Sequence, residues 1–271
     1  MRYFIRRASD FFDWYSGVYE FPTDKDILER EIRRLVYLDG DLDTYQQFTP
    51  QQPQEKLAEI KAYLSDSPSL DPVRASELWH EKGLIHQMGK EYEQAIASFD
   101  RALEIKPDDH QAWYNRGVAL GNLGRFEQAI ASYDRALEFK PDYPDAWNNR
   151  GIALGNLGRF EQAIASYDRA LEFKPDYPDA WNNRGIALHN LGRFEQAIAS
   201  WDRAIKINSN DANAYYNKAC CYGLQNNVEL AIENLQRAIN LDVEYQDMAK
   251  TDKDFDQIRG DERFQSFLNR V

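Results

Sequence analysis

The chain has 271 residues, of which 45 are acidic and 33 basic, so its formal net charge is −12 and its pI is near 4.9. A chain of this charge repels phosphate backbones, which makes nucleic acid an unexpected partner. The sequence contains no apolar run long enough to predict a transmembrane segment, and its first residues lack the features of a secretory signal.

Residues 1–75 are predicted to form an N-terminal helical extension, with helices at about 24–38 and around Leu57, Ile60 and Leu64. Residues 1–22 are rich in aromatic side chains and either pack on the rest of the chain or dock a partner or a membrane surface. Linkers are predicted at 49–54 and 65–72. The acidic turn at 39–43 lacks the full pattern of a calcium loop, so no metal site is predicted there.

From residue 76 the sequence repeats with a period of 34 residues, which indicates a stack of identical supersecondary units. One large aromatic residue recurs at this spacing, and it marks the same position in every unit: Trp79, Trp113, Trp147, Trp181 and Tyr215. Five units follow from the alignment, at 76–109, 110–143, 144–177, 178–211 and 212–245. The remaining residues, 246–271, are predicted to cap the apolar end of the stack with one or two short helices.

Each unit is predicted to hold two helices. In the third unit these run from about Asp145 to Leu157 and from about Phe160 to Phe173, since apolar residues recur there at helical spacing. Gly158 stands where a left-handed helix cap is expected. The small residues Gly151 and Ala163 are expected to let the two helices approach closely.

This pattern resembles the tetratricopeptide repeat family, in arrays of the type found in bacteria. The residues that carry the resemblance in the third unit are Trp147, Gly151, Phe160, Ala163, Tyr167, Ala170 and Pro175. The outer units depart from it, with Lys90 in place of a glycine and Ala219 in place of another. The resemblance implies an all-α fold, a right-handed superhelix (an α–α solenoid), with a concave groove lined by the first helix of each unit.

An asparagine occupies the same position on four of these first helices: Asn115, Asn149, Asn183 and Asn217. Asparagine is a modest helix former, so helix propensity does not explain its recurrence. Its amide offers both a donor and an acceptor, and the resemblance implies that such a row can bind the backbone of an extended peptide. Alternatively, the amides bond within their own unit or were copied by duplication. Asn156 and Asn190 continue the same helix faces.

Arg116, Arg150 and Arg184 each follow an asparagine of this row. They either meet acidic groups of a peptide or form ion pairs with a neighbouring unit. Tyr114 is predicted to lie on the rim of the groove. His80 and Leu84 stand where a carboxylate clamp for chaperone tails needs other residues, so that type of binding is not expected.

The sequence predicts no catalytic residues, no metal site and no cofactor. The four histidines lack metal-ligand spacing, and the adjacent Cys220 and Cys221 are expected to pack in a helix in a reducing, cytoplasmic protein. We therefore predict a non-enzymatic scaffold that binds a protein or peptide in its groove. The alternatives are an assembly or regulatory factor acting through residues 1–22, and an accessory subunit of an enzyme or signalling complex. Near-identical units also make weak self-association possible.

Overall fold

The computed structural model describes residues 53–66 and 71–270, and all regular structure in these ranges is helical. It divides into two compact units, Met1–Ser132 and Tyr133–Val271, and each is considered by itself below. The helix α7 (Phe126–Phe139) contains the division between them. The predicted helix at 24–38, the aromatic segment 1–22 and the acidic turn 39–43 lie outside the described residues. No helix within the described ranges is long and apolar enough to cross a membrane.

The first compact unit contains a helix, α3 (Pro53–Asp66), that was expected around Leu57, Ile60 and Leu64. It packs on α4 (Pro72–Met88), where the buried Ile60 contacts Leu78 and Ile85. The helix α4 pairs with α5 (Tyr92–Ile105), and α5 contacts α6 (His110–Asn122). Thus α3 covers an apolar face of the first repeat.

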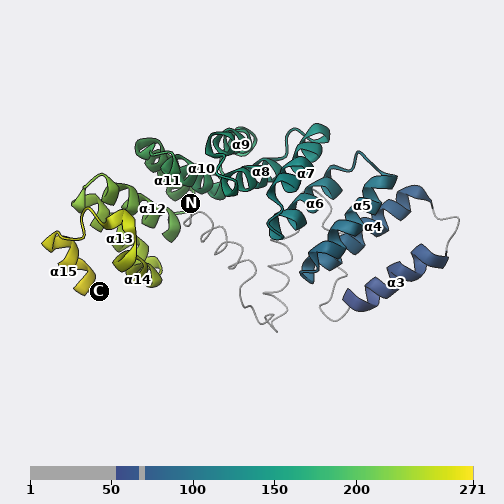
Figure 1. Ribbon diagram of the computed structural model, residues 1–271, viewed down its shortest axis with the longest axis horizontal. Coiled ribbons are helices and arrows are strands. Elements are labelled where there is room, and N and C mark those ends of the chain that lie inside the picture. Colours follow the sequence, from purple (N-terminus) through teal and green to yellow (C-terminus); the bar gives the residue numbers. More distant parts are fainter. Residues whose placement is uncertain (1–52, 67–70, 271) are drawn as a thin grey trace. The chain divides into compact units, whose positions relative to one another are not determined.

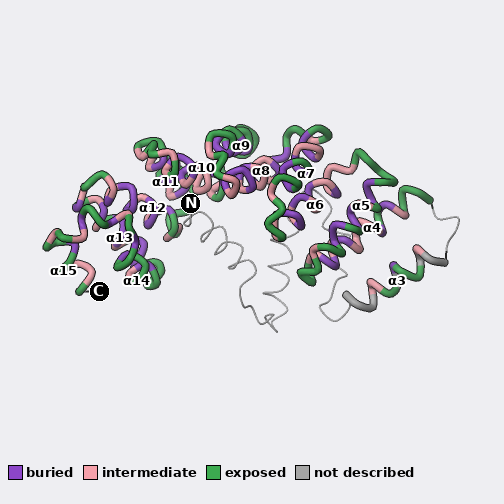
Figure 2. Tube along the Cα trace, in the orientation of Figure 1, coloured by how far each residue is buried: buried purple, intermediate pink, exposed green. Residues whose placement is uncertain are grey.

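In the second compact unit, helices pair in chain order (Figure 1). The pairs are α8 (Pro144–Asn156) with α9 (Phe160–Phe173), α10 (Pro178–Asn190) with α11 (Phe194–Ile207), and α12 (Ala212–Leu224) with α13 (Val228–Leu241). Buried and exposed positions alternate along each helix, as expected when one stripe faces a neighbour (Figure 2). The first helices also contact one another, α8 with α10 and α10 with α12.

Close approach within a pair depends on a missing side chain, as predicted. A Cβ added to Gly151 would lie 2.5 Å from Cε1 of Tyr167, and one added to Gly185 would lie 2.5 Å from the Trp201 ring. The turn between the two helices requires positive φ, which is +73° at Gly158. In the outer repeats the same place is taken by Lys90 and Asn226, at φ 58° and 57°.

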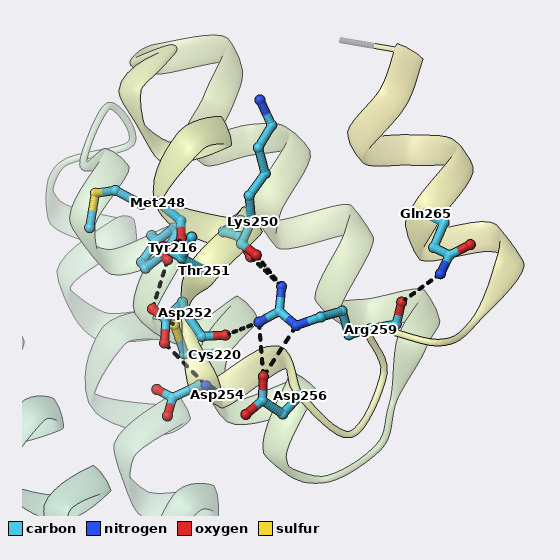
Figure 3. A network of polar contacts seen from close by, with 11 residues as sticks. Tyr216, Cys220, Met248, Lys250, Thr251, Asp252, Asp254, Asp256, Arg259 and Gln265 are labelled. Atoms are coloured by element: carbon cyan, nitrogen blue, oxygen red, sulfur yellow. Dashed lines mark hydrogen bonds and ion pairs between the residues drawn. The ribbon is translucent and has the colours of Figure 1, made fainter.

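The end of the second compact unit is closed by α14 (Glu244–Thr251), the 3₁₀ turn η1 (Lys253–Phe255) and α15 (Glu262–Arg270). Phe255 and Phe264 are fully buried against residues of α12 and α13. The Arg259 guanidinium ties the segment together by donating to the main-chain oxygens of Lys250 and Asp252 and to the Asp256 carboxylate (Figure 3). These helices therefore bury the apolar face that the last repeat would otherwise expose.

Candidate functional site

The candidate site in the second compact unit is a row of residues on the first helices of its repeats. On α8 the row consists of Asn149, Ile152 and Asn156, which helical spacing places on one face, and all three are partly exposed. On α10 it consists of Asn183, Ile186 and Asn190, of which Asn190 is exposed. We call these six residues the asparagine row.

The asparagine amides of the row are partly used between neighbouring repeats. The Nδ2 of Asn183 donates to Oδ1 of Asn148 at 3.1 Å, and Asn148 is buried. In the first compact unit the corresponding contact joins Asn115 Nδ2 and His80 Nε2 at 2.9 Å. Burial lowers the pKa of His80, which favours the neutral ring. Each contact fixes the orientation of an amide but uses only one of its donor and acceptor positions.

Asn156 and Asn190 are also bonded, each within its own helix. Their Nδ2 atoms donate to the carbonyl oxygens of Ile152 and Ile186 four residues earlier, at 2.9 and 2.8 Å. Such back-bonding leaves the side-chain carbonyl as the group directed away from the helix. The amide nitrogens of Asn156 and Asn190 therefore bond within their own units.

Two predicted site residues are less accessible than expected. Tyr114 is 8% exposed, so it is buried and does not lie on an open rim. Asn217 is 7% exposed and lies on α12, the helix that η1 of the closing segment contacts. The row in the second compact unit is thus open on α8 and α10 and covered on α12.

The arginines beside the row form ion pairs with the preceding repeat. The Nε atom of Arg150 lies 2.6 Å from Asp134 Oδ1, and its Nη1 donates to Ser166 Oγ at 2.7 Å. Arg184 repeats both contacts with Asp168 and Ser200. In the first compact unit Arg116 does the same with Asp100 and Ser132. The structure therefore contains the inter-unit ion pair that was one of the two alternatives for these arginines.

The sequence reading missed the serines that complete this arrangement. Ser132, Ser166 and Ser200 are buried, and each also donates to a carbonyl oxygen four residues earlier. Their recurrence every 34 residues was a usable signal. The recurrence alone does not reveal this role, because a serine inside a helix gives no indication of a partner in another helix.

Three potential metal ligands, Cys220, Asp252 and Asp254, lie together under the closing segment. Hydrogen bonds account for their arrangement. Asp252 Oδ2 accepts from the Tyr216 hydroxyl at 2.8 Å and from Cys220 Sγ at 3.7 Å, while Oδ1 accepts from the Asp254 amide at 3.1 Å (Figure 3). The neighbouring Cys221 is buried, and burial raises the pKa of its thiol. The cluster is therefore explained as part of the closing segment.

Family models decide the classification. A model described as TPR repeat matches residues 85–124, 122–158 and 156–192. Models described as tetratricopeptide repeat match residues 178–211 and 200–233. The chain belongs to the tetratricopeptide repeat family. Its fold is that of an interaction scaffold, which is the general role that the family supports.

Solved structures agree with this fold. A crystal structure of MamA matches with a TM-score of 0.58 and 19% identity, over 60% of this chain and 95% of the chain in that structure. MamA 41-end from Desulfovibrio magneticus RS-1 matches with a TM-score of 0.59 and 17% identity, over 62% and 96%. YrrB, a TPR protein with an unusual peptide-binding site, matches with a TM-score of 0.57 and 21% identity, over 78% and 97%. Comparison with curated proteins gives no match.

Proposed function

We propose that this tetratricopeptide repeat protein is a non-enzymatic scaffold that binds an extended segment of a partner protein along the asparagine row. The observation that carries the proposal is the oriented side-chain amide of Asn183. Its Nδ2 is held by Asn148, and its side-chain carbonyl accepts no hydrogen bond among the described residues. An oriented amide with spare capacity can pair with a peptide backbone without recognising side chains.

The spacing of the helices suits such a ligand. Packed helices lie about 8–10 Å apart, and an extended chain advances about 3.3 Å per residue. Successive first helices would therefore meet the ligand at about every third residue. Ile152 and Ile186, beside the asparagines, supply apolar contacts of the same period. The described peptide-binding site of YrrB, a protein of the same fold, is consistent with this type of ligand.

The test is to remove two amides of the row from the full chain, as Asn149→Ala with Asn183→Ala. Partner binding should weaken by about 2–4 kcal/mol, because each lost bond also leaves a buried group of the ligand unpaired. Partners are first captured from the native lysate and identified by mass spectrometry, and their affinities are then measured by calorimetry. Circular dichroism should show unchanged helix content.

The matched control removes two amides from a second helix, as Gln236→Ala with Asn240→Ala on α13. These side chains bond to each other and lie away from the row. The control should bind the captured partner as the natural chain does. Equal affinity of the natural chain and the row variant would contradict the proposal.

A further inference from the structure

We propose that the segment bound by the asparagine row is basic, with lysine or arginine side chains at about every third residue. This inference rests on the proposed function and adds the chemical class of the partner. It follows from where the charged groups of the second compact unit lie.

The cations beside the row are already neutralised by carboxylates of the neighbouring repeat. Arg150 is paired with Asp134, and Arg184 with Asp168, both with 2.6 Å between nitrogen and oxygen. Lys218, the equivalent residue on α12, lies 2.5 Å from Asp202. An acidic ligand would have to compete with these carboxylates for the same cations, so the row is not arranged to receive one.

Carboxylates lie near the start of the helices that carry the row, on the same face as the asparagines. Asp145 lies four residues before Asn149, and Asp179 lies four residues before Asn183, so each is one turn from a row asparagine. Asp145 is partly exposed and Asp179 is exposed. The Tyr177 hydroxyl donates to Asp145 at 2.7 Å, which holds this carboxylate in place without supplying a positive charge.

Two lysines and a further carboxylate also lie near these helix ends. Lys140 and Lys174 precede α8 and α10, and their ammonium groups lie over the rings of Tyr143 and Tyr177, 5.0 and 4.4 Å from the centroids. A third carboxylate, Asp211, begins α12 and accepts from Asn182. Over residues 133–271 the sequence holds 22 acidic and 17 basic residues, which leaves a net charge of −5. The potential that an approaching peptide meets is therefore negative.

The asparagines and the carboxylates together favour a ligand that carries positive side chains at a fixed spacing. The asparagines pair with the backbone, while Asp145 and Asp179 are repeated at the same 34-residue interval as the asparagines. A ligand whose backbone meets each helix at every third residue brings every third side chain near one of these carboxylates. Lysine and arginine complement them, whereas glutamate is repelled.

The test uses three labelled peptides of four repeats each, Lys-Val-Ser, Gln-Val-Ser and Glu-Val-Ser, and the full chain in a fluorescence anisotropy titration. The Lys peptide should bind most tightly and the Glu peptide most weakly, and the difference should shrink at high salt. Replacing both carboxylates, as Asp145→Asn with Asp179→Asn, should weaken Lys-peptide binding about three- to tenfold and leave Gln-peptide binding unchanged. Asparagine keeps the acceptor for Tyr177, so the fold is preserved.

The control has the same change in net charge on the second helices, as Glu138→Gln with Glu172→Gln. These residues pair with arginines of their own helices. If the control weakens the Lys peptide as much, general attraction explains binding and the inference is wrong. It is also overturned if the Gln or Glu peptide binds as tightly as the Lys peptide, while Asn149→Ala with Asn183→Ala still weakens all three. If that asparagine variant changes no affinity, the proposed function itself fails.

Discussion

The helices α10 and α12 occupy the same place in successive repeats, yet their equivalent faces differ in how far they are exposed to solvent. On α10, Asn183 and Ile186 are partly exposed. On α12, the equivalents Asn217 and Cys220 are 7% and 4% exposed. Asp252, which follows α14, reaches α12 and accepts hydrogen bonds there from Tyr216 and Cys220.

This comparison shows that the repeat alone does not decide which residues form a binding surface. A first helix that is followed by another complete repeat keeps its row open. On a first helix that is followed by the closing segment, the equivalent residues are buried in the core. Cysteine in place of isoleucine at position 220 agrees with this change, because a smaller side chain leaves room for the Asp252 carboxylate.

The largest effect is expected from Asp252→Ala, which should destabilise the chain by about 2–4 kcal/mol by leaving the buried Tyr216 hydroxyl without its acceptor. Asp252 is 1% exposed, so water does not replace it. Thermal unfolding followed by circular dichroism measures the change. Asp252→Asn keeps an acceptor and should lose less. A loss no larger than that of Glu233→Ala, at an exposed position on α13, would show that Asp252 does not hold the closing segment.

Much of the repeat structure could be predicted from the sequence, because the 34-residue period identifies which residues are equivalent in α10 and α12. The helix Phe160–Phe173 was predicted at its observed bounds, and the close approach at Gly151 and the turn at Gly158 followed from residue size and backbone freedom. Burial of Tyr114 could not be predicted, because an aromatic residue at a helix face is compatible with rim or core. The burial of Asn217 and Cys220 could not be predicted either, because the contacts of Asp252 with α12 come from a segment outside the repeats, to which the 34-residue period does not extend.

Exchanging the equivalent residues Ile186 of α10 and Cys220 of α12 tests whether the two faces differ in burial. Cys220→Ile should destabilise the chain by about 1–3 kcal/mol, since a larger side chain enters a filled core beneath Asp252. The reverse change, Ile186→Cys, should cost about 0.5–1.5 kcal/mol or less, because its site is partly open to water. Chemical denaturation of both variants provides the measurement. Equal losses would indicate that the two faces are buried alike.

The turns that follow α10 and α12 differ in the residue that takes the positive φ angle, and a smaller change in stability is expected there. Gly192, after α10, has φ +72°, and Asn226, after α12, has φ 57°. Gly192→Ala should cost about 1 kcal/mol, because a Cβ disfavours this backbone conformation even though nothing lies within 4 Å of it. Asn226→Gly should be neutral or slightly stabilising. A loss of stability on that second change would mean that the Asn226 side chain, rather than its φ angle, matters.

The smallest expected effect is a difference in ion-pair strength between Arg184 and Lys218, the cations that follow Asn183 and Asn217. Arg184 pairs with Asp168 and also donates to Ser200, whereas Lys218 pairs with Asp202 alone and Asn234 stands where the serine would be. Both acidic partners are more than half exposed, so each pair should contribute only about 0.2–1 kcal/mol, with the arginine pair stronger. Double-mutant cycles of Arg184→Ala with Asp168→Ala, and of Lys218→Ala with Asp202→Ala, measure the two coupling energies directly. If the coupling in the lysine pair equals that in the arginine pair, then the guanidinium gives this ion pair no advantage over the ammonium, and the contrast between α10 and α12 rests on the closing segment alone.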